Sequence, residues 1–448
     1  MSAPAVSLRP ARLPRSAERL AVAPAGSGRA WSLYLLVTTA LVPFVNAIGP
    51  GQIAMGDVLN VVALGAFAVL LISRRTRLSL PFLIPAFVIA GASLLATANA
   101  LAPEQSLVTL AQDAYLYLWF LMLVNVCPAH EDLRAVRVTW MLVSALIALY
   151  GVFDLVHHYG YGIHELFSPK GVRAQATFGN PNFFADYLVL SLFVIMSLGG
   201  EVTWLLRLPA AGAILMGLLA SKSLGGVLSA LVGAATWFMV RALTRRTSKL
   251  SLVAVSLIVF AFAVVGVWIV KEWEIGRRGL QVITSESMVG RLDKSSQGRL
   301  QIWGELTRRF EHSPLGIGPG NSSFIELSVA NRERRGGSIY GKEAHNDYVG
   351  YAVERGPFAL LALLATIGLA FRAIAAGWSA IRSRAWREGP PSQWTAAFAG
   401  GLAASAIHSF TIEKLHFRHY WLFIALLFAM SEWMRRSGGA PEPRRRTA

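Results

Sequence analysis

The sequence has few charged residues and a single cysteine, and each shortage excludes a class of protein. Only 15% of the 448 residues are charged, against about 25% in a typical soluble domain, which excludes an ordinary water-soluble protein. The lone cysteine, Cys127, excludes a disulfide within the chain. Hydrophobic residues, in contrast, make up 54% of the chain, and the mean hydropathy is +0.49. The composition therefore predicts an integral membrane protein.

Long apolar runs indicate the architecture. A helix needs about 20 apolar residues to cross about 30 Å of hydrocarbon, and runs close to this length recur along the whole chain. They cover residues 31–49, 54–73, 79–99, 106–126, 136–156, 180–199, 203–220, 223–241, 250–270, 356–375, 391–410 and 417–434. We therefore predict an all-α integral membrane protein with about twelve transmembrane helices.

The basic residues predict the orientation in the membrane. Lys and Arg gather in both tails and in alternate short loops, whereas the loops between these hold few. Because cytoplasmic loops carry an excess of Lys and Arg, we expect both termini in the cytoplasm. The same bias accounts for most of the net charge of +17, so nucleic-acid binding is not indicated. The first apolar run is long enough to remain as an anchor, and no cleavable signal peptide is predicted.

Two outer segments, 157–179 and 271–355, interrupt the pattern of short connections. Loops longer than about 15 residues are uncommon unless they bind or catalyse, so we expect function to reside there. The predicted organisation is a basic tail (1–30), nine spans (31–270), a partly helical outer-loop domain (271–355), three spans (356–434) and a second basic tail (435–448).

Within the longer loop, the apolar periodicity of 298–312 predicts a helix. Arg299 falls inside the apolar stripe formed by Trp303, Leu306 and Phe310. Two interpretations are open. The arginine stem lies along the membrane surface with its head group in water, or the guanidinium faces an anion held between this helix and the spans.

The loop continues with the turn "SPLGIGPGN" at 313–321, in which Gly318 and Gly320 predict unusual backbone angles. These glycines either serve only the turn or offer backbone N–H groups to a phosphate. His345 then precedes a predicted helix, 346–355, just before an apolar run. Ionisable groups at a membrane boundary tend to face an internal cavity, although a histidine in contact with interfacial water is the alternative.

The shorter outer segment ends in a capping pattern. Asn180 is predicted to cap a helix whose first residue is Pro181. The N-terminus of such a helix attracts anions through its N–H groups and partial positive charge. Arg173 stands a few residues upstream, where it either is solvated or joins this helix end in binding an anion.

Four stretches in order resemble one known family. Arg173 with "TFGNPNFFADYL", then "GRLQIW", "HSPLGIGPGN" and "AHNDY…ERG" are similar to the O-antigen ligase and polymerase superfamily of bacterial inner-membrane glycosyltransferases. The motifs cover 172–356, and the pattern of spans resembles the family over the rest of the chain. His345, Asn346 and Gly356 match the pattern of the family's ligases, whereas Ala359 stands where those ligases have Gly, Thr or Tyr.

The resemblance implies a GT-C-like fold with a large periplasmic loop between helices 9 and 10. It also implies transfer of a glycan from undecaprenyl diphosphate to a sugar hydroxyl of the lipid A core oligosaccharide, at the periplasmic face of the inner membrane. A histidine suits general base catalysis near neutral pH, and arginine suits diphosphate. The expected catalytic residues are His345, Arg173 and Arg299, and the expected substrate-binding residues are Asn180, Asn182, Asn346, Tyr348, Gly318 and Gly320.

No metal or other cofactor is expected, because the first outer loop offers only Asp57 in place of paired acids. A cage built from Asp347, Glu354 and Asp186 is the alternative. A polymerase that extends a second lipid-linked repeat shares the same motifs, and a protein-glycosylating or exopolysaccharide relative also stays open. A transporter of lipid-linked sugars would explain Asp113, Asp154 and His408 within apolar runs. The sequence does not predict the oligomeric state.

Overall fold

The computed structural model describes residues 28–45, 54–73, 78–126, 130–167, 171–245, 299, 302–322, 344–381 and 389–436. Every regular element in these ranges is a helix. They are α1 (Gly28–Leu41), α2 (Met55–Ser73), α3 (Leu83–Thr97), α4 (Pro103–Val126), α5 (His130–Tyr159), α6 (Ile163–Phe167), η2 (Ala176–Phe178), α7 (Pro181–Leu198), η3 (Gly199–Glu201), α8 (Trp204–Ala220), α9 (Leu224–Arg245), α13 (Asp347–Ala380), α15 (Pro390–His408) and α16 (Arg418–Arg436). A further helix covers 302–312.

The helices agree with the predicted spans. Six helices in the described ranges (α2, α4, α5, α7, α9 and α13) are long and apolar enough to cross a membrane, and α3 and α8 are shorter apolar helices. α1 ends at Leu41, well before the end of the predicted run 31–49, and 250–270 lies outside the described residues. The all-helical prediction is confirmed for the described chain, whereas a count of about twelve spans stays a prediction.

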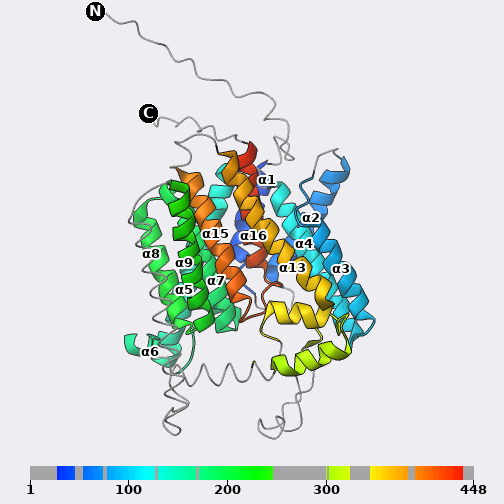
Figure 1. Cartoon of the computed structure of the whole chain (residues 1–448). Coiled ribbons are helices and arrows are strands. Elements are labelled where there is room, and N and C mark those ends of the chain that lie inside the picture. The colour runs from blue at the N-terminus through cyan, green and yellow to red at the C-terminus, as the bar shows by residue number, and fades with distance from the viewer. Residues whose placement is uncertain are drawn as a thin grey trace, which may run out of the picture.

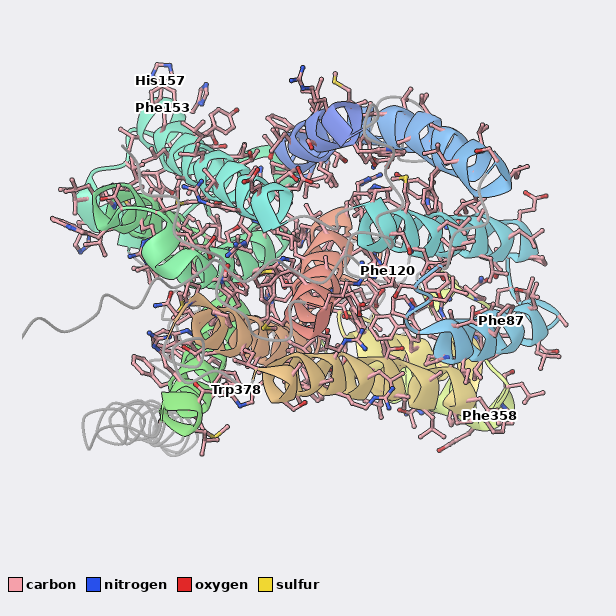
Figure 2. All side chains as sticks on the ribbon, turned by 90° about the horizontal axis from the view of Figure 1, so that it is seen from above. Phe87, Phe120, Phe153, His157, Phe358 and Trp378 are labelled. Carbon is pink, nitrogen blue, oxygen red and sulfur yellow. The ribbon has the colours of Figure 1, made fainter. Side chains whose placement is uncertain are left out.

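The bundle is arranged around α16, which lies among the other helices when the molecule is seen from above (Figure 2). It packs against α4, α5, α7, α13 and α15. Phe120 is fully buried beside it, with its ring centroid 5.6 Å from that of Trp421. Phe87, Phe153 and Phe358 instead point away from the bundle (Figure 2) and are more than half exposed. An outer surface of large apolar side chains suits hydrocarbon rather than water.

The two ends of the bundle differ. α1 begins and α16 ends at the top of Figure 1, whereas α6 and the helix 302–312 lie at the opposite end. We call this opposite end the loop end. The turns that join α7 to its preceding segment, α8 to α9 and α15 to α16 lie there as well, so the sequence segments with the predicted site residues share one end of the molecule.

α13 contains a sharp kink at Gly356, which has φ 81° and ψ 174°. Its first part, 347–355, runs beside the helix 302–312 at the loop end, and its second part crosses the bundle (Figure 1). The predicted division between a helix at 346–355 and a span from 356 falls at this kink. Only glycine adopts such angles readily.

Candidate functional site

The helix that follows His345 begins as the sequence predicts. The side-chain oxygen of Asn346 accepts hydrogen bonds from the backbone N–H groups of Tyr348 at 2.9 Å and Val349 at 3.1 Å. This cap satisfies amides that have no partner within α13. His345 precedes the cap with a φ of +51°, which residues other than glycine seldom adopt. Strained backbone of this kind is common at active sites.

The start of α13 is tied to the connection between α15 and α16. The backbone N–H of Asp347 donates to the carbonyl of Ser409 at 2.9 Å, and its Oδ1 accepts from the backbone N–H of Lys414 at 3.0 Å. The hydroxyl of Tyr348, a predicted substrate-binding residue, donates to the carbonyl of Ala406 at 2.7 Å. These three bonds fix the position of the segment that carries His345.

The Gly-rich turn binds Glu354 of α13. Gly318 and Gly320 have positive φ angles of 95° and 74°, so the predicted unusual backbone is confirmed. The N–H of Gly318 donates to the Glu354 carbonyl at 3.0 Å, and the N–H groups of Gly320 and Ser322 donate to its carboxylate at 2.9 and 3.0 Å. In this conformation the two glycine amides hold Glu354 rather than face a ligand. A phosphate could use them only after the turn had left that carboxylate.

The predicted helix in the outer loop is present and packs as its periodicity indicates. Leu306 is almost fully buried, and Trp303 and Phe310 pack on the same small core, to which Ala344 and Val353 also contribute. The indole N–H of Trp303 donates to the carbonyl of Ala344 at 2.8 Å. The outer-loop helix therefore touches the residue directly before His345.

Arg299 lies at the N-terminal side of this outer-loop helix and is half-buried. Burial lowers the pKa of its guanidinium from the ordinary value. It makes no hydrogen bond or ion pair with another described residue. It is close enough to His408 for the two charges to interact, which places it beside the loop end of α15. A half-buried cation without a counter-ion is costly, and an anionic ligand would remove that cost.

Arg173 is oriented by residues on three neighbouring segments. Its Nε donates to the carbonyl of Ser221 at 2.8 Å, and its Nη2 donates to Oδ1 of Asn182 at 2.7 Å. Ser223 donates to the same oxygen at 3.0 Å. Arg173 is thus held at the loop ends of α7, α8 and α9.

The predicted cap at the start of α7 is confirmed. Oδ1 of Asn180 accepts from the N–H of Asn182 at 2.8 Å, and Pro181 occupies the first helical position. Both asparagines therefore use their side-chain oxygens to build the corner that holds Arg173. This places the positive end of α7 next to that guanidinium.

Contacts between α9 and α15 connect the Arg173 corner with the His345 segment. A Cβ on Gly225, near the start of α9, would lie only 2.5 Å from Oγ1 of Thr411, so the two segments touch. Thr411 in turn donates to the carbonyl of His408 at 2.9 Å. Ser409, the next residue, accepts from Asp347. Arg173, Arg299 and His345 therefore all lie around the loop ends of α7, α9, α13 and α15.

A charged cluster lies deeper in the bundle than this site. The sequence did not predict that its residues would come together. Asp186 of α7 is almost fully buried and contacts Nδ1 of His408 at 2.7 Å, Nζ of Lys414 at 3.0 Å and Nε2 of His419 at 2.9 Å. Lys414 also donates to Oγ of Ser405 at 2.7 Å. Ionisable residues inside apolar helices signal such pairing, and that signal was present at Asp186 and His408, but the partners were not predictable from spacing.

Two other acidic residues within the spans, Asp113 and Asp154, also have partners. Asp113 of α4 pairs with the buried guanidinium of Arg355, which also donates to Ser93 at 3.1 Å. Asp154 pairs with His158 one turn along α5, at 2.8 Å. These charges join helices or stabilise one helix surface, so a translocation pathway is not needed to explain them.

No group of three His, Cys, Asp or Glu side chains in the described ranges is placed to hold a metal ion. The alternative cage of Asp347, Glu354 and Asp186 does not form in this structure. Asp347 accepts from the backbone N–H of Lys414, and Glu354 accepts from the amides of Gly320 and Ser322. Asp186 instead pairs with the ammonium of Lys414 and with two histidines.

Residues 209–364, about a third of the chain, match a family model described as O-Antigen ligase. This match supports membership of the O-antigen ligase superfamily. It includes Arg299, both turn glycines, His345 and the start of α13, whereas Arg173 and Asn182 lie before it. A comparison with curated proteins gives no significant match.

Proposed function

We propose that the chain is an O-antigen ligase. It transfers a polysaccharide from undecaprenyl diphosphate to a sugar hydroxyl of the lipid A core oligosaccharide. The observation that carries this proposal is Arg299, a half-buried guanidinium without a counter-ion among the described residues, inside the region that matches the O-antigen ligase family. A lipid-linked diphosphate is the anion that such a glycosyltransferase must bind.

His345 acts as the general base in the proposed reaction. The acceptor hydroxyl attacks the anomeric carbon, and its proton passes to the imidazole as the new bond forms. A positioned base contributes about 10²–10⁴-fold to such a step. The bond between the anomeric carbon and the diphosphate oxygen breaks on the opposite face, so the anomeric centre inverts.

Arg173 and Arg299 hold the leaving group. The electron pair of the broken bond leaves with the diphosphate, which is a stable anion and needs no proton. Planar guanidinium groups match phosphate oxygens through paired N–H donors, and they stabilise the charge that develops in the transition state. Support for Arg173 comes from its fixed orientation beside the N-terminus of α7, a second source of positive charge.

Asn180, Asn182, Asn346 and Tyr348 position these groups in the proposal. Asn180 caps α7 and Asn346 caps α13. Asn182 accepts from Arg173, and Tyr348 anchors α13 to α15. The amide nitrogens of the asparagines remain donors for sugar hydroxyls. The proposed site uses no metal.

The proposed orientation places the loop end in the periplasm and both termini in the cytoplasm of a bacterial inner membrane. The excess of Lys and Arg in the tails and alternate loops supports it. In this orientation the lipid-linked donor and the lipid A core reach the loop end from the outer leaflet. The helix 302–312, which belongs to the predicted outer loop, lies at this same end.

The test is transfer by the purified, full-length chain in liposomes that contain the lipid-linked donor and lipid A core. We expect glycan on lipid A core with the wild-type chain, and a loss of about 10²–10⁴-fold in rate for His345→Ala. His164→Ala, which changes an exposed histidine of α6 at the same end, serves as the matched control. Retained donor binding in His345→Ala would assign the loss to chemistry.

Two other outcomes would overturn the ligase assignment. Elongation of the donor on a second lipid-linked repeat, with no glycan on lipid A core, would identify a polymerase. Movement of the donor lipid across the bilayer without any covalent change would identify a transporter. In cells, deletion of a ligase removes all glycan from lipid A, whereas deletion of a polymerase leaves single repeats attached.

A further inference from the structure

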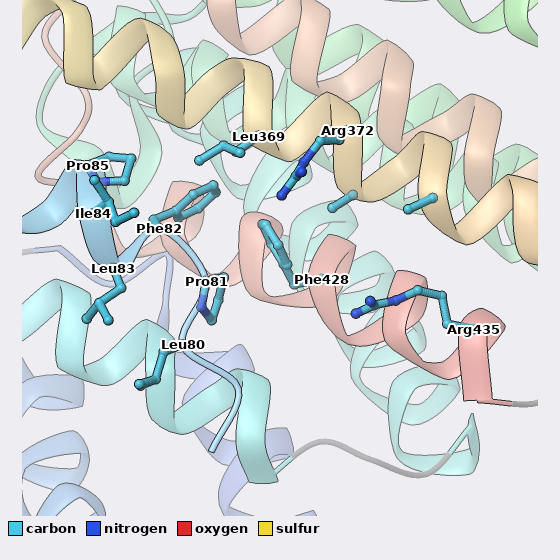
Figure 3. A pocket seen from close by; sticks show the side chains of 12 residues that line it. Leu80, Pro81, Phe82, Leu83, Ile84, Pro85, Leu369, Arg372, Phe428 and Arg435 are labelled. Carbon is cyan, nitrogen blue, oxygen red and sulfur yellow. The ribbon is translucent and has the colours of Figure 1, made fainter. Parts of the chain in front are cut away.

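A groove at the opposite end of the bundle has no role in the proposed reaction. It has a volume of about 610 Å³ and lies between the segment before α3, the second half of α13 and the end of α16 (Figure 3). Its lining is apolar except for two arginines. The lining residues are Leu80, Pro81, Phe82, Leu83, Ile84, Pro85, Leu369, Arg372, Ala373, Ala376, Phe428 and Arg435. This volume falls within the range of about 300–1,000 Å³ that is typical of ligand pockets.

The wall formed by the segment before α3 is rigidly built. Phe82 has a φ of +64°, a strained angle for a bulky residue. It is held by stacking on Phe120, with ring centroids 5.5 Å apart, and by an edge contact with Phe428 at 4.9 Å. Asn125 exchanges two hydrogen bonds of 2.9 Å with the backbone of Ser79. The groove wall is therefore held by contacts that fix a costly backbone conformation.

The charges in the groove do not cancel. Arg372 makes no hydrogen bond or ion pair within the described part of the chain. Arg435 pairs with Glu432, which Arg436 also contacts. α3 begins without a side-chain N-cap, so the positive end of its helix dipole adds to the arginines. Figure 3 shows both arginine side chains extending toward the groove.

The position of Arg372 along α13 suits a lipid head group. It lies three positions before the end of the predicted span 356–375, which corresponds to about 5 Å along a helix. An arginine this close to the expected interface can reach an anionic head group. Basic pockets between transmembrane helices on the cytoplasmic side bind the head groups of anionic lipids.

We propose that this groove binds one anionic phospholipid of the leaflet at that end of the bundle. The phosphate lies between Arg372 and Arg435, near the start of α3. An acyl chain runs along Leu369, Phe82 and Phe428. Charge complementarity selects this occupant over a neutral lipid, and the apolar lining selects it over a free phosphate ion. The proposal does not depend on the transferase activity.

The test compares lipid retention by charge variants. The full-length chain is purified from nanodiscs of phosphatidylcholine with a minor fraction of phosphatidylglycerol, and native mass spectrometry measures the ratio of the two lipids that remain bound. Wild type is expected to retain phosphatidylglycerol selectively. Arg372→Gln and Arg435→Gln are each expected to lower this selectivity about fivefold, the effect of one basic residue near an anionic lipid.

Arg436→Gln is the matched control, because Arg436 pairs with the same glutamate but does not line the groove. It is expected to keep the wild-type ratio. Equal losses in all three variants would mean that the lipid responds only to the general positive charge of this end, and would overturn the proposal. Unchanged ratios in Arg372→Gln and Arg435→Gln would mean that the two arginine side chains are solvated and do not bind lipid. That result would also overturn the proposal.

A second pair of variants tests the groove itself without changing charge. Ala376→Phe fills space between α13 and α16, whereas Ala375→Phe changes the neighbouring, exposed position that does not line the groove. Loss of bound phosphatidylglycerol in the first variant alone supports the groove. Equal retention in both would overturn it. Melting temperatures of all variants identify any that fail to fold, and the arginine variants decide the question if Ala376→Phe is one of them.

Discussion

The ammonium of Lys414 lies 3.0 Å from the carboxylate of Asp186, and both side chains are almost fully buried. The backbone N–H of the same lysine binds Asp347, two residues after His345. One residue therefore links the charged interior of the bundle to the segment that carries the predicted base. This link joins the polar groups inside the apolar bundle to the candidate site at its end.

Removing one partner of this pair is expected to destabilise the protein strongly. Asp186→Asn leaves the Lys414 charge buried without its counter-ion, at a cost of about 3–5 kcal/mol in the free energy of unfolding. Lys414→Met leaves the carboxylate of Asp186 buried without the lysine charge. The measurement is the melting temperature and the inactivation half-life of the detergent-solubilised chain. Asp154→Asn, which changes an ion pair that is partly exposed, is the control and is expected to cost about 0–1 kcal/mol.

The double variant Asp186→Asn with Lys414→Met makes this prediction specific. Because it removes both charges together, its destabilisation is expected to be clearly smaller than the sum of the two single changes. Strict additivity would show that the two groups do not interact in the membrane, and would contradict the pairing.

Glu354→Gln is expected to release the Gly-rich turn. The carboxylate accepts from the N–H groups of Gly320 and Ser322, and hydrogen bonds to a charged group contribute about 1.5–3 kcal/mol each. We expect faster amide hydrogen exchange in 316–322 and slower transfer. Glu305→Gln, which removes a carboxylate whose partner Arg308 is exposed, is the control. Unchanged exchange in the turn would show that other contacts hold it.

The sequence was most informative where a local rule operates. Asn180 followed by Pro181 predicted a capped helix because capping depends on adjacent residues, and the structure has that cap. The stripe that includes Trp303 and Leu306 predicted which face of the outer-loop helix is buried, for the same reason. Local patterns also predicted that a helix would begin after His345.

Pairing across the bundle was not predictable from one sequence. Asp186 and Lys414 are 228 positions apart, and nothing in the spacing indicates which basic residue a buried carboxylate will meet. Likewise, the turn at Gly318 was compatible with a phosphate cradle until its partner, the carbonyl of Glu354, was known. Such contacts depend on how helices pack, which propensity and periodicity do not determine.

Gly356→Ala is expected to destabilise the kink of α13. The residue has a φ of 81° and a ψ of 174°, and a Cβ there would lie 3.0 Å from the carbonyl oxygen of Leu315. Residues other than glycine pay about 1–3 kcal/mol for such a backbone conformation. Gly368→Ala is a matched control on the same helix, because a Cβ added at that position would meet nothing within 4 Å.

The two variants are expected to change stability in opposite directions. Alanine in a helix interior is favoured over glycine by about 0.5–1 kcal/mol, so Gly368→Ala raises the melting temperature slightly, whereas Gly356→Ala lowers it and slows transfer. Wild-type stability in Gly356→Ala would mean that the kink is not required.

Arg299 provides the sharpest test of the proposed chemistry, because its charge has no counter-ion among the described residues. Arg299→Gln is expected to lower the single-turnover rate of transfer about 10²–10³-fold, as loss of one group that stabilises transition-state charge does elsewhere. Arg299→Lys keeps the charge but loses the planar pair of donors, so we expect an intermediate rate. Arg308→Gln changes an exposed arginine of the same outer-loop helix and is expected to have the wild-type rate. If Arg299→Gln were more stable than wild type but equally active, the buried guanidinium would destabilise the fold without contributing to catalysis. The diphosphate would then have to bind elsewhere.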